Sequence, residues 1–389
     1  MRKLQWTALV SLLLVTAGIP LIQAGYEWLH EGRVPHVFSL FTCVPSKESL
    51  HRWDEDAKDA SIFAKWLRPR ALQHRYDLLG EMGAKSIQGK EDWLFYRQDV
   101  DYLMQPHYSD ERFYRGSFDT LVGEKRVNLR NPQIAITDFR DRLRARGIEL
   151  LLVPIPGKPS VYPEKLGAGF SAPSLSPTVA LLTDLESKGF RTVDLFTPLL
   201  RAKSQGNTLY LKQDTHWTPA GVDVAADAVA EAIRRTGCCA EPDSLTSEVR
   251  YSLVDSATVR WGDIAEMTKI PSRQQIWGSE TVAAHRVMDR HTGKPYKDEE
   301  DSPILWLGDS FSRIYQTDAP GSAGIISQVA KRLNRPLTSI VNDGGASTIV
   351  RQQMLRKGHL LKGKKLVVWA FVERDLRFGD KGWQLEELP

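Results

Sequence analysis

The sequence predicts an α/β protein: a mainly parallel sheet with helices on both faces and one insertion. Apolar runs of strand length alternate with stretches of helical periodicity from about residue 131 onward, which is the pattern of strands joined by crossover helices. The longest runs are continuously apolar, as expected for strands covered on both faces. In such sheets ligands bind beyond the carboxyl ends of the strands, so polar residues there are the candidates for a functional site.

The chain begins with a segment suited to export. A basic pair at positions 2 and 3 precedes the apolar run LVSLLLVTAGIPLI (residues 9–22), and the small residue Ala24 follows. This order is typical of a secretory signal. The run is shorter than the ~20 residues of a membrane span, but positions 4–8 would extend it far enough. We predict that residues 1–25 are either a cleaved signal peptide or a membrane anchor, with a buried N-terminal helix as the alternative.

Composition indicates a globular protein. Of the 389 residues, 42% are hydrophobic and 26% are charged, which excludes a disordered or fibrous chain. The net charge of +4 is mildly basic. It would suit an anionic polysaccharide or lipid headgroups, and it would equally suit an ordinary solvated surface. We predict no nucleic-acid partner.

The three cysteines fit an oxidising compartment. Cys43 stands far from the adjacent pair Cys238 and Cys239, so one disulfide could form and leave one thiol. A bridge from Cys43 to either member of the pair, a vicinal disulfide and three free thiols all stay open. No second cysteine pair or closely spaced histidine pair accompanies them, and we predict no metal site and no cofactor.

We predict that residues 26–88 form a helical N-terminal segment and that residues 89–389 form the main domain. The stretch ASIFAKWLRPRALQHRYDLLG (residues 60–80) has helical periodicity. GKEDWLFYRQD (residues 89–99) reads as a turn followed by a short strand. A segment that breaks the strand–helix alternation, residues 242–301, is predicted to be an insertion, either a small β excursion or a lid.

Two helix starts are marked by caps. Asn131 is an N-cap followed by proline at the first helical position, and this helix should end at Gly147. Thr218 caps an alanine-rich helix in the same way. A further helix is expected over residues 179–188 and another after Ser310. The expected strands are residues 148–156, 191–196, 207–212, 303–308, 337–342 and 365–372.

A nucleophile is suggested by ILWLGDSFSRIYQ (residues 304–316). The apolar strand runs into Gly-Asp-Ser and then into a helix, which would expose Ser310 at the carboxyl end of the strand beside backbone N–H groups. The alternative is a plain turn with a helix cap.

A base for that serine is suggested by QDTHW (residues 213–217). His216 could take the proton of Ser310, and Asp214, two residues earlier, could orient the imidazole. Taken singly, Asp214 could be a turn residue and His216 a core histidine. Together with Ser310 they favour a Ser-His-Asp site.

These motifs resemble a known family. QDTHWTPAG and LGDSFS are similar to the SGNH-hydrolase-like catalytic domain of the alginate O-acetyltransferases of the AlgJ/AlgX type, and so are four other stretches: GKEDWLFY, VPIPGKPSVYPEKL, RWGDIAEM and VVWAFVERDL. The resemblance covers about residues 89–378. It implies an SGNH-like fold and acetyl transfer to an exopolysaccharide in the bacterial periplasm, with Asp214, His216 and Ser310 as the triad. It also implies a membrane-embedded acyltransferase as acetyl donor and other polysaccharide-export proteins as partners.

One departure leaves the polysaccharide open. Gly-Asp-Ser stands here where the alginate enzymes of the family are expected to have Gly-Thr-Ser, so the acceptor is either alginate or a related exopolysaccharide. Two other functions are compatible with the same residues. One is an esterase that removes acetyl groups, and the other is a non-catalytic polysaccharide-binding subunit.

The remaining candidates are less sharply marked. The stretch NDGGAS (residues 342–347) follows a predicted strand, and the N–H of Gly344 or Gly345 could help Ser310 to bind an oxyanion; a simple loop is the alternative. Arg374 follows the last strand and could contact an acidic sugar, or pair with a neighbouring carboxylate. Trp217 is a candidate substrate contact, or else a packing residue.

Overall fold

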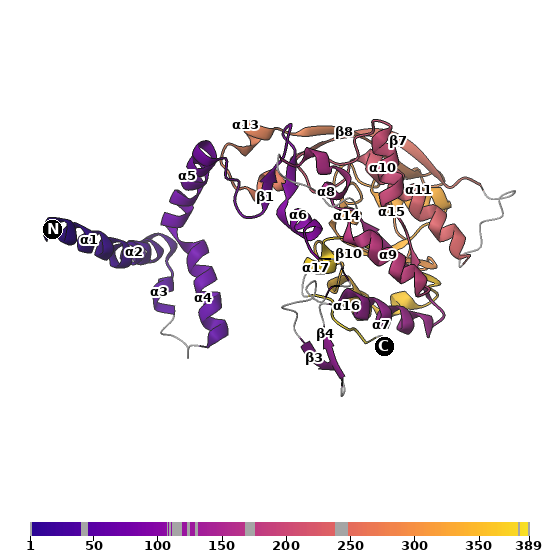
Figure 1. Cartoon of the computed structure of the whole chain (residues 1–389), viewed down its shortest axis with the longest axis horizontal. Coiled ribbons are helices and arrows are strands. Elements are labelled where there is room, and N and C mark those ends of the chain that lie inside the picture. The colour runs from indigo at the N-terminus through magenta and orange to yellow at the C-terminus, as the bar shows by residue number, and fades with distance from the viewer. Residues whose placement is uncertain are drawn as a thin grey trace. The chain divides into compact units, whose positions relative to one another are not determined.

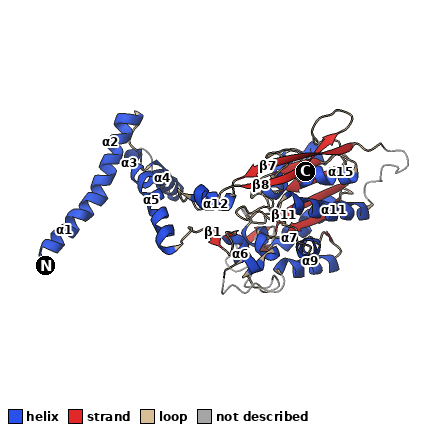
Figure 2. Ribbon diagram, turned by 90° about the horizontal axis from the view of Figure 1, so that it is seen from above, coloured by secondary structure: helices blue, strands red, loops and turns tan. Residues whose placement is uncertain are grey.

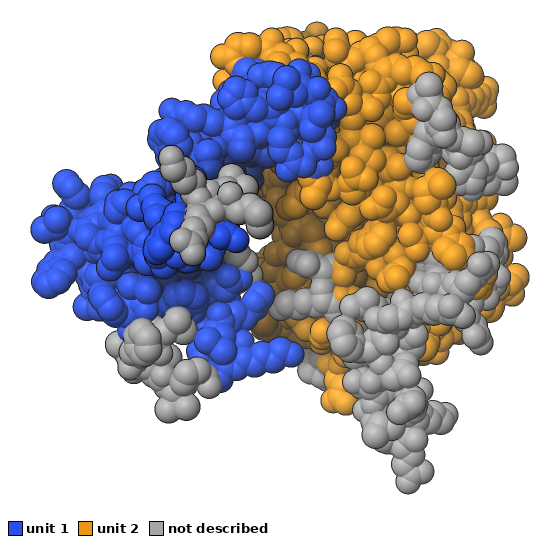
Figure 3. Space-filling model, turned by 60° about the vertical axis from the view of Figure 1, so that its left-hand side comes forward, with its two compact units in different colours: residues 1–83, 269–272 blue, residues 84–268, 273–389 orange. Residues whose placement is uncertain are grey.

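The computed structural model describes residues 2–39, 46–106, 108, 110, 119–122, 125–128, 131–167, 176–237, 248–379 and 382–387. The chain forms two compact units (Figure 3), one of Met1–Gly83 with Lys269–Ser272, the other of Ala84–Thr268 with Arg273–Pro389. Cys43, Cys238 and Cys239 lie outside the described residues, so their pairing stays a prediction.

The first unit is helical. Helix α1 (Arg2–Leu13), a π-helical turn (Leu14–Gly18) and helix α2 (Ile19–Glu31) follow one another without a break. Within them, Gln5–Glu31 is long and apolar enough to cross a membrane, and no residue of its most apolar window is buried. The unit continues with α3 (His36–Ser39), α4 (Lys47–Ala60) and α5 (Ile62–Leu79). The apolar helix is compatible with a signal peptide or a signal anchor, and α5 confirms the predicted helix of residues 60–80.

The second unit is built on a parallel sheet of five strands in the order β10-β9-β11-β5-β6. Of these strands, β10 is labelled in Figure 1 and β11 in Figure 2, with helices of the unit around them. The strands are β5 (Glu149–Ile155), β6 (Arg191–Thr192), β9 (Ile304–Gly308), β10 (Thr338–Val341) and β11 (Leu366–Val372). Central strand β11 pairs in parallel with β5 on one side and β9 on the other. Its residues are all buried, as the continuous apolar run predicts.

Helices cover both faces of this sheet. Alternate residues of the strands point to opposite faces, and the core divides accordingly. Val368 and Trp306 pack in one cluster with helices α11 (Pro219–Thr236) and α15 (Ile325–Leu333). Trp369 and Leu307 pack in the other with α7 (Pro132–Arg144), α9 (Pro177–Ser187) and α16 (Ile349–Arg356). The predicted α/β class with helices on both faces is confirmed.

The predicted caps are present. The side chain of Asn131 accepts from the N–H of Gln133 at the start of α7. Thr218 accepts from the N–H of Gly221 at the start of α11. Both helices have proline at the first or second position, where a missing N–H costs no hydrogen bond.

Three sequence predictions need correction. Residues 207–212 form no strand, because Tyr210 makes only an isolated antiparallel bridge to Trp217. The strand expected over residues 191–196 shortens to β6, because Asp194 accepts from the N–H of Phe196 and starts helix α10 (Phe196–Ser204). The helix after Ser310 is a single turn, α14 (Ser310–Arg313).

The segment 242–301 contains an antiparallel pair, β7 (Tyr251–Arg260) and β8 (Glu280–Asp289), with α12 (Asp263–Met267) and α13 (Arg273–Trp277) between its strands. The other elements of this unit are short. They are β1 (Ser86–Gln88), β2 (Leu94–Tyr96), α6 (Arg97–Leu103), β3 (Asp119–Val122), β4 (Lys125–Asn128), α8 (Lys158–Val161), the 3₁₀ turns Pro163–Lys165 and Gly358–Leu361, and α17 (Asp375–Phe378).

Candidate active site

Ser310 stands on a tight connection between β9 and α14. Asp309 caps the helix by accepting from the N–H of Phe311 at 2.9 Å, and its other oxygen accepts from the N–H of Val372 in β11, also at 2.9 Å. Gly308 is required, because a Cβ there would lie 2.1 Å from the hydroxyl oxygen of Ser312. The connection is therefore fixed on both sides, and half-buried Ser310 is held at the carboxyl end of the sheet.

Asp214 and His216 lie in a turn that closes on itself. The N–H of Leu211 donates to the carbonyl of His216 at 3.1 Å, and the N–H of Thr218 donates to the carbonyl of Leu209 at 2.9 Å. Trp217 fills the core below this turn with 0% of its surface exposed. The base is thus positioned by a closed turn between α10 and α11, and not by the end of a strand of the sheet.

The structure brings Asp214, His216 and Ser310 together. Nδ1 of His216 lies 2.6 Å from Oδ1 of Asp214, and Nε2 lies 2.8 Å from Oγ of Ser310. An ionised carboxylate only accepts, so we assign the proton to Nδ1, which leaves Nε2 as the acceptor for the serine hydroxyl. Asp214 is 1% exposed and His216 is 4% exposed. The arrangement can take the proton of Ser310 and stabilise the imidazolium that results.

The surrounding charges keep Asp214 ionised and make His216 a stronger base. Burial lowers the pKa of His216, but the negative charges of Asp214 and Asp263 and the hydrogen bond with Asp214 outweigh it, and the pKa lies above its ordinary value. Burial likewise raises the pKa of Asp214, yet the charge and hydrogen bonds of His216 and the charge of Arg260 leave it well below the usual range. Asp214 is therefore an anion at neutral pH.

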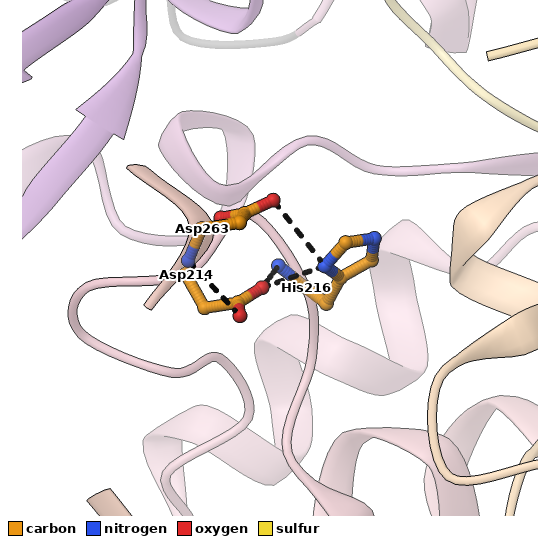
Figure 4. A group of neighbouring side chains, drawn as sticks. All are labelled: Asp214, His216 and Asp263. Atoms are coloured by element: carbon orange, nitrogen blue, oxygen red, sulfur yellow. Dashed lines mark hydrogen bonds and ion pairs between the residues drawn. The ribbon is translucent and has the colours of Figure 1, made fainter. Parts of the chain in front are cut away.

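A second carboxylate, which the sequence reasoning missed, faces the same imidazole (Figure 4). Oδ2 of Asp263 lies 3.7 Å from Nδ1 of His216. Thr215 holds this carboxylate: its N–H donates to Oδ1 and its hydroxyl donates to Oδ2, each at 2.6 Å. The N–H of Asp263 in turn donates to Asp214 at 3.3 Å. Burial and the charge of Asp214 raise the pKa of Asp263.

Asp214, His216 and Asp263 could in principle hold a metal ion, since their ligand atoms lie within 4.8 Å of one another. The 2.6 Å separation of Nδ1 and Oδ1 is that of a strong hydrogen bond. Two ligands that share a zinc ion, each about 2 Å from it, stand farther apart than this. The geometry suits a shared proton.

A cleft of about 360 Å³ opens above Ser310 and His216. Gly344 lines it, whereas the N–H of Gly345 is already used by the carbonyl of Asn342 at 3.1 Å. Arg374 also lines it, and its partner is Asp99 at 2.8 Å. The prediction that Trp217 contacts substrate is wrong for this structure, because the indole is fully buried and packs on Phe311, 5.3 Å between ring centroids.

Comparisons with known proteins identify the family of this chain. Residues 87–373 match the family model described as an SGNH hydrolase-like domain, acetyltransferase AlgX. The chain belongs to this family. The family predicted from the sequence motifs is thereby confirmed.

Two curated relatives are named probable alginate O-acetylase AlgJ. The protein of Pseudomonas fluorescens is 25% identical over 310 residues, which are 77% of this chain and 71% of that one. The protein of Pseudomonas aeruginosa is 28% identical over 316 residues, 77% of this chain and 73% of that one. Among solved structures, the O-acetyltransferase domain of Pseudomonas putida AlgJ has a TM-score of 0.55 at 21% identity, and the match covers 75% of this chain and 92% of that one. This likeness confirms the predicted SGNH-like fold.

Proposed function

We propose that this AlgX-family protein is an O-acetyltransferase that moves acetyl groups to hydroxyls of an exopolysaccharide through an acetyl-serine intermediate. One observation carries the proposal: His216 contacts Asp214 with one ring nitrogen and Ser310 with the other, at 2.6 and 2.8 Å. This is the geometry of an activated nucleophile with an oriented base.

In the first half-reaction, Ser310 Oγ attacks the carbonyl carbon of an acetyl donor while its proton passes to Nε2 of His216. The bond from Oγ to the acetyl carbon forms, the donor's own bond to that carbon breaks, and His216 returns the proton to the leaving group. Asp214 stabilises the imidazolium. The N–H of Ser310 lies at the first position of α14, where it has no acceptor within the helix. We assign this N–H, with that of Gly344, to the oxyanion.

In the second half-reaction a sugar hydroxyl replaces the donor. His216 takes the hydroxyl proton, the sugar oxygen attacks the acetyl carbon, and the bond to Ser310 Oγ breaks as Oγ regains the proton. An apolar N-terminal helix suits a protein that works in the periplasm, held by a signal anchor or released after cleavage. A membrane-embedded acyltransferase is the proposed acetyl donor, and other polysaccharide-export proteins are the proposed neighbours.

The test is mass spectrometry of the full chain after exposure to a small activated acetyl ester. We expect one acetyl group on Ser310, and its transfer to added oligosaccharide. Ser310→Ala should take up none, while Ser187→Ala, on the surface of α9, should behave as wild type. An adduct that decays in water at the same rate with or without sugar would indicate an acetyl esterase. Undiminished transfer by Ser310→Ala would refute the assignment.

A further inference from the structure

The charged residues that line the cleft are unevenly balanced. Two are cationic, Arg313 and Arg374, and three are carboxylates, Asp263, Asp343 and Asp375. A polysaccharide of uronic acids carries one carboxylate on every ring, so its binding needs cations that are free to pair with it. Whether the cleft can accept such a chain therefore depends on what these two arginines already contact.

Arg374 is committed to the protein. Its guanidinium donates to buried Asp99 at 2.8 Å, and its side chain is only 12% exposed. It also lies over the rings of Tyr96 and Phe311, 5.1 and 5.9 Å from their centroids. Moving this guanidinium toward a sugar would leave Asp99 as an unpaired buried charge, which is strongly unfavourable.

Arg313 is more exposed, at 34% of its side chain, but it too is engaged. Its Nε lies 2.8 and 2.9 Å from the two oxygens of Asp343, and its Nη1 donates to Asp318. Asp343 follows β10, and the preceding residue anchors the loop through the bond from Asn342 N–H to the carbonyl of Gly308 at 3.0 Å. The carboxylate of Asp343 thus occupies the position beside Nε of Arg313 that a sugar carboxylate would need.

We propose that the acceptor is a polysaccharide whose rings carry no carboxylate, and that Asp343 determines this specificity. This proposal rests on the proposed function. Asp343 occupies the guanidinium of Arg313 and adds its own negative charge to the cleft wall. A neutral sugar can donate its hydroxyls to these carboxylates, whereas a uronate would meet like charges and find each of the two lining arginines already paired.

The test compares two acceptors of equal length, a neutral cello-oligosaccharide and an oligomannuronate, with an activated acetyl ester as donor and the full chain as enzyme. For wild type we expect kcat/KM to be at least about tenfold higher with the neutral acceptor. Asp343→Asn removes the carboxylate charge beside Nε of Arg313 and leaves the contact of Nη1 with Asp318, so it should raise the ratio of uronate to neutral acceptor by about tenfold. Asp184→Asn, an equal change of charge on α9, should leave this ratio unchanged.

The salt dependence of kcat/KM in the wild type is an independent test of whether the cleft repels or attracts a uronate. Raising NaCl from about 20 to about 300 mM screens charge interactions, so kcat/KM for the uronate should rise if the cleft repels it and fall if the cleft attracts it. A wild type that prefers the uronate, a fall with salt, or an unchanged ratio in Asp343→Asn would overturn the proposal. So would acetylation of Ser310 followed by transfer to neither acceptor. Absence of acetyl-Ser310 would instead refute the proposed function.

Discussion

Replacing Asp214 by Asn tests how the charge of the base is stabilised. In the wild type the imidazole of His216 becomes a cation only as Ser310 attacks, so a nearby carboxylate stabilises the transition state more than the resting enzyme. With the carboxylate and imidazolium charges centred about 4 Å apart and an effective dielectric constant of about 20, their attraction is about 4 kcal/mol. We therefore expect Asp214→Asn to slow acetylation of Ser310 by about 10³.

Asp263 offers a second, weaker source of the same stabilisation. Its Oδ2 lies 3.7 Å from Nδ1, and its side chain is 31% exposed. Solvent screening at about twice the dielectric constant, and a distance of about 5 Å between charge centres, reduce the attraction to between 1 and 2 kcal/mol, or about tenfold in rate. Asp263→Asn should therefore be about 100 times faster than Asp214→Asn.

The assay is the single-turnover rate of acetyl-Ser310 formation, followed by quenched-flow mass spectrometry in both single variants and in the double variant. We expect the double variant to be slower than Asp214→Asn alone, because no carboxylate then faces Nδ1. If Asp263→Asn proved slower than Asp214→Asn, the two carboxylates would have exchanged roles. Rates of both variants within threefold of wild type would refute the electrostatic reasoning altogether.

Three further predictions follow from single contacts. Because the pKa of His216 lies above its ordinary value and only the neutral imidazole is a base, the acetylation rate should rise with pH, and Asp214→Asn should move the midpoint to lower pH; a pH-rate profile in both proteins checks this. Gly262→Ala would place a Cβ 2.1 Å from the carbonyl oxygen of Gln213, so it should destabilise the fold by about 2 kcal/mol and slow acetylation. Denaturant unfolding measures the loss of stability, and the control is Gly167→Ala, whose new Cβ would meet nothing within 4 Å. Asp99→Asn leaves the buried guanidinium of Arg374 without its carboxylate and should cost about 3–5 kcal/mol of unfolding free energy; a loss below about 1 kcal/mol would mean that solvent reaches this pair.

The sequence predicted the sheet well where the physical signal is local. Strands β9 and β11 are buried on both faces, so they are continuously apolar and recognisable without knowledge of their partners. The caps at Asn131 and Thr218 are also local, because each bonds to an N–H two or three residues ahead. Residues 207–212 misled for the same reason: Leu209, Tyr210 and Leu211 form a short apolar run and are buried in the core, but the chain turns back and forms only an isolated bridge to Trp217 instead of joining the sheet.

In the candidate site, too, the residues marked by a local sequence pattern could be predicted, and those brought in by the fold could not. The spacing of Asp214 and His216 places both on one short turn, and the apolar strand before Ser310 exposes it, so these three residues could be predicted. Asp263 lies 49 residues beyond Asp214 in sequence, and only the fold brings its carboxylate to the same imidazole. Trp217 was misjudged because an indole beside a candidate histidine suits a sugar platform and a core equally well; burial decides between them.

Asp309 does not determine which polysaccharide is the acceptor. The sequence comparison with Gly-Thr-Ser suggested that this residue bears on the identity of the polysaccharide. In the structure, however, its carboxylate is 1% exposed and accepts from the N–H groups of Phe311 and Val372. A threonine hydroxyl could cap the helix but has one oxygen where the carboxylate has two, so Asp309 adds a tie between the serine-bearing turn and β11. This role is structural, and Asp309 is not among the residues that line the cleft. Discrimination between acceptors must therefore come from the side chains that line the cleft, and there the pair of Arg313 and Asp343 is the element whose charge a sugar carboxylate would have to displace.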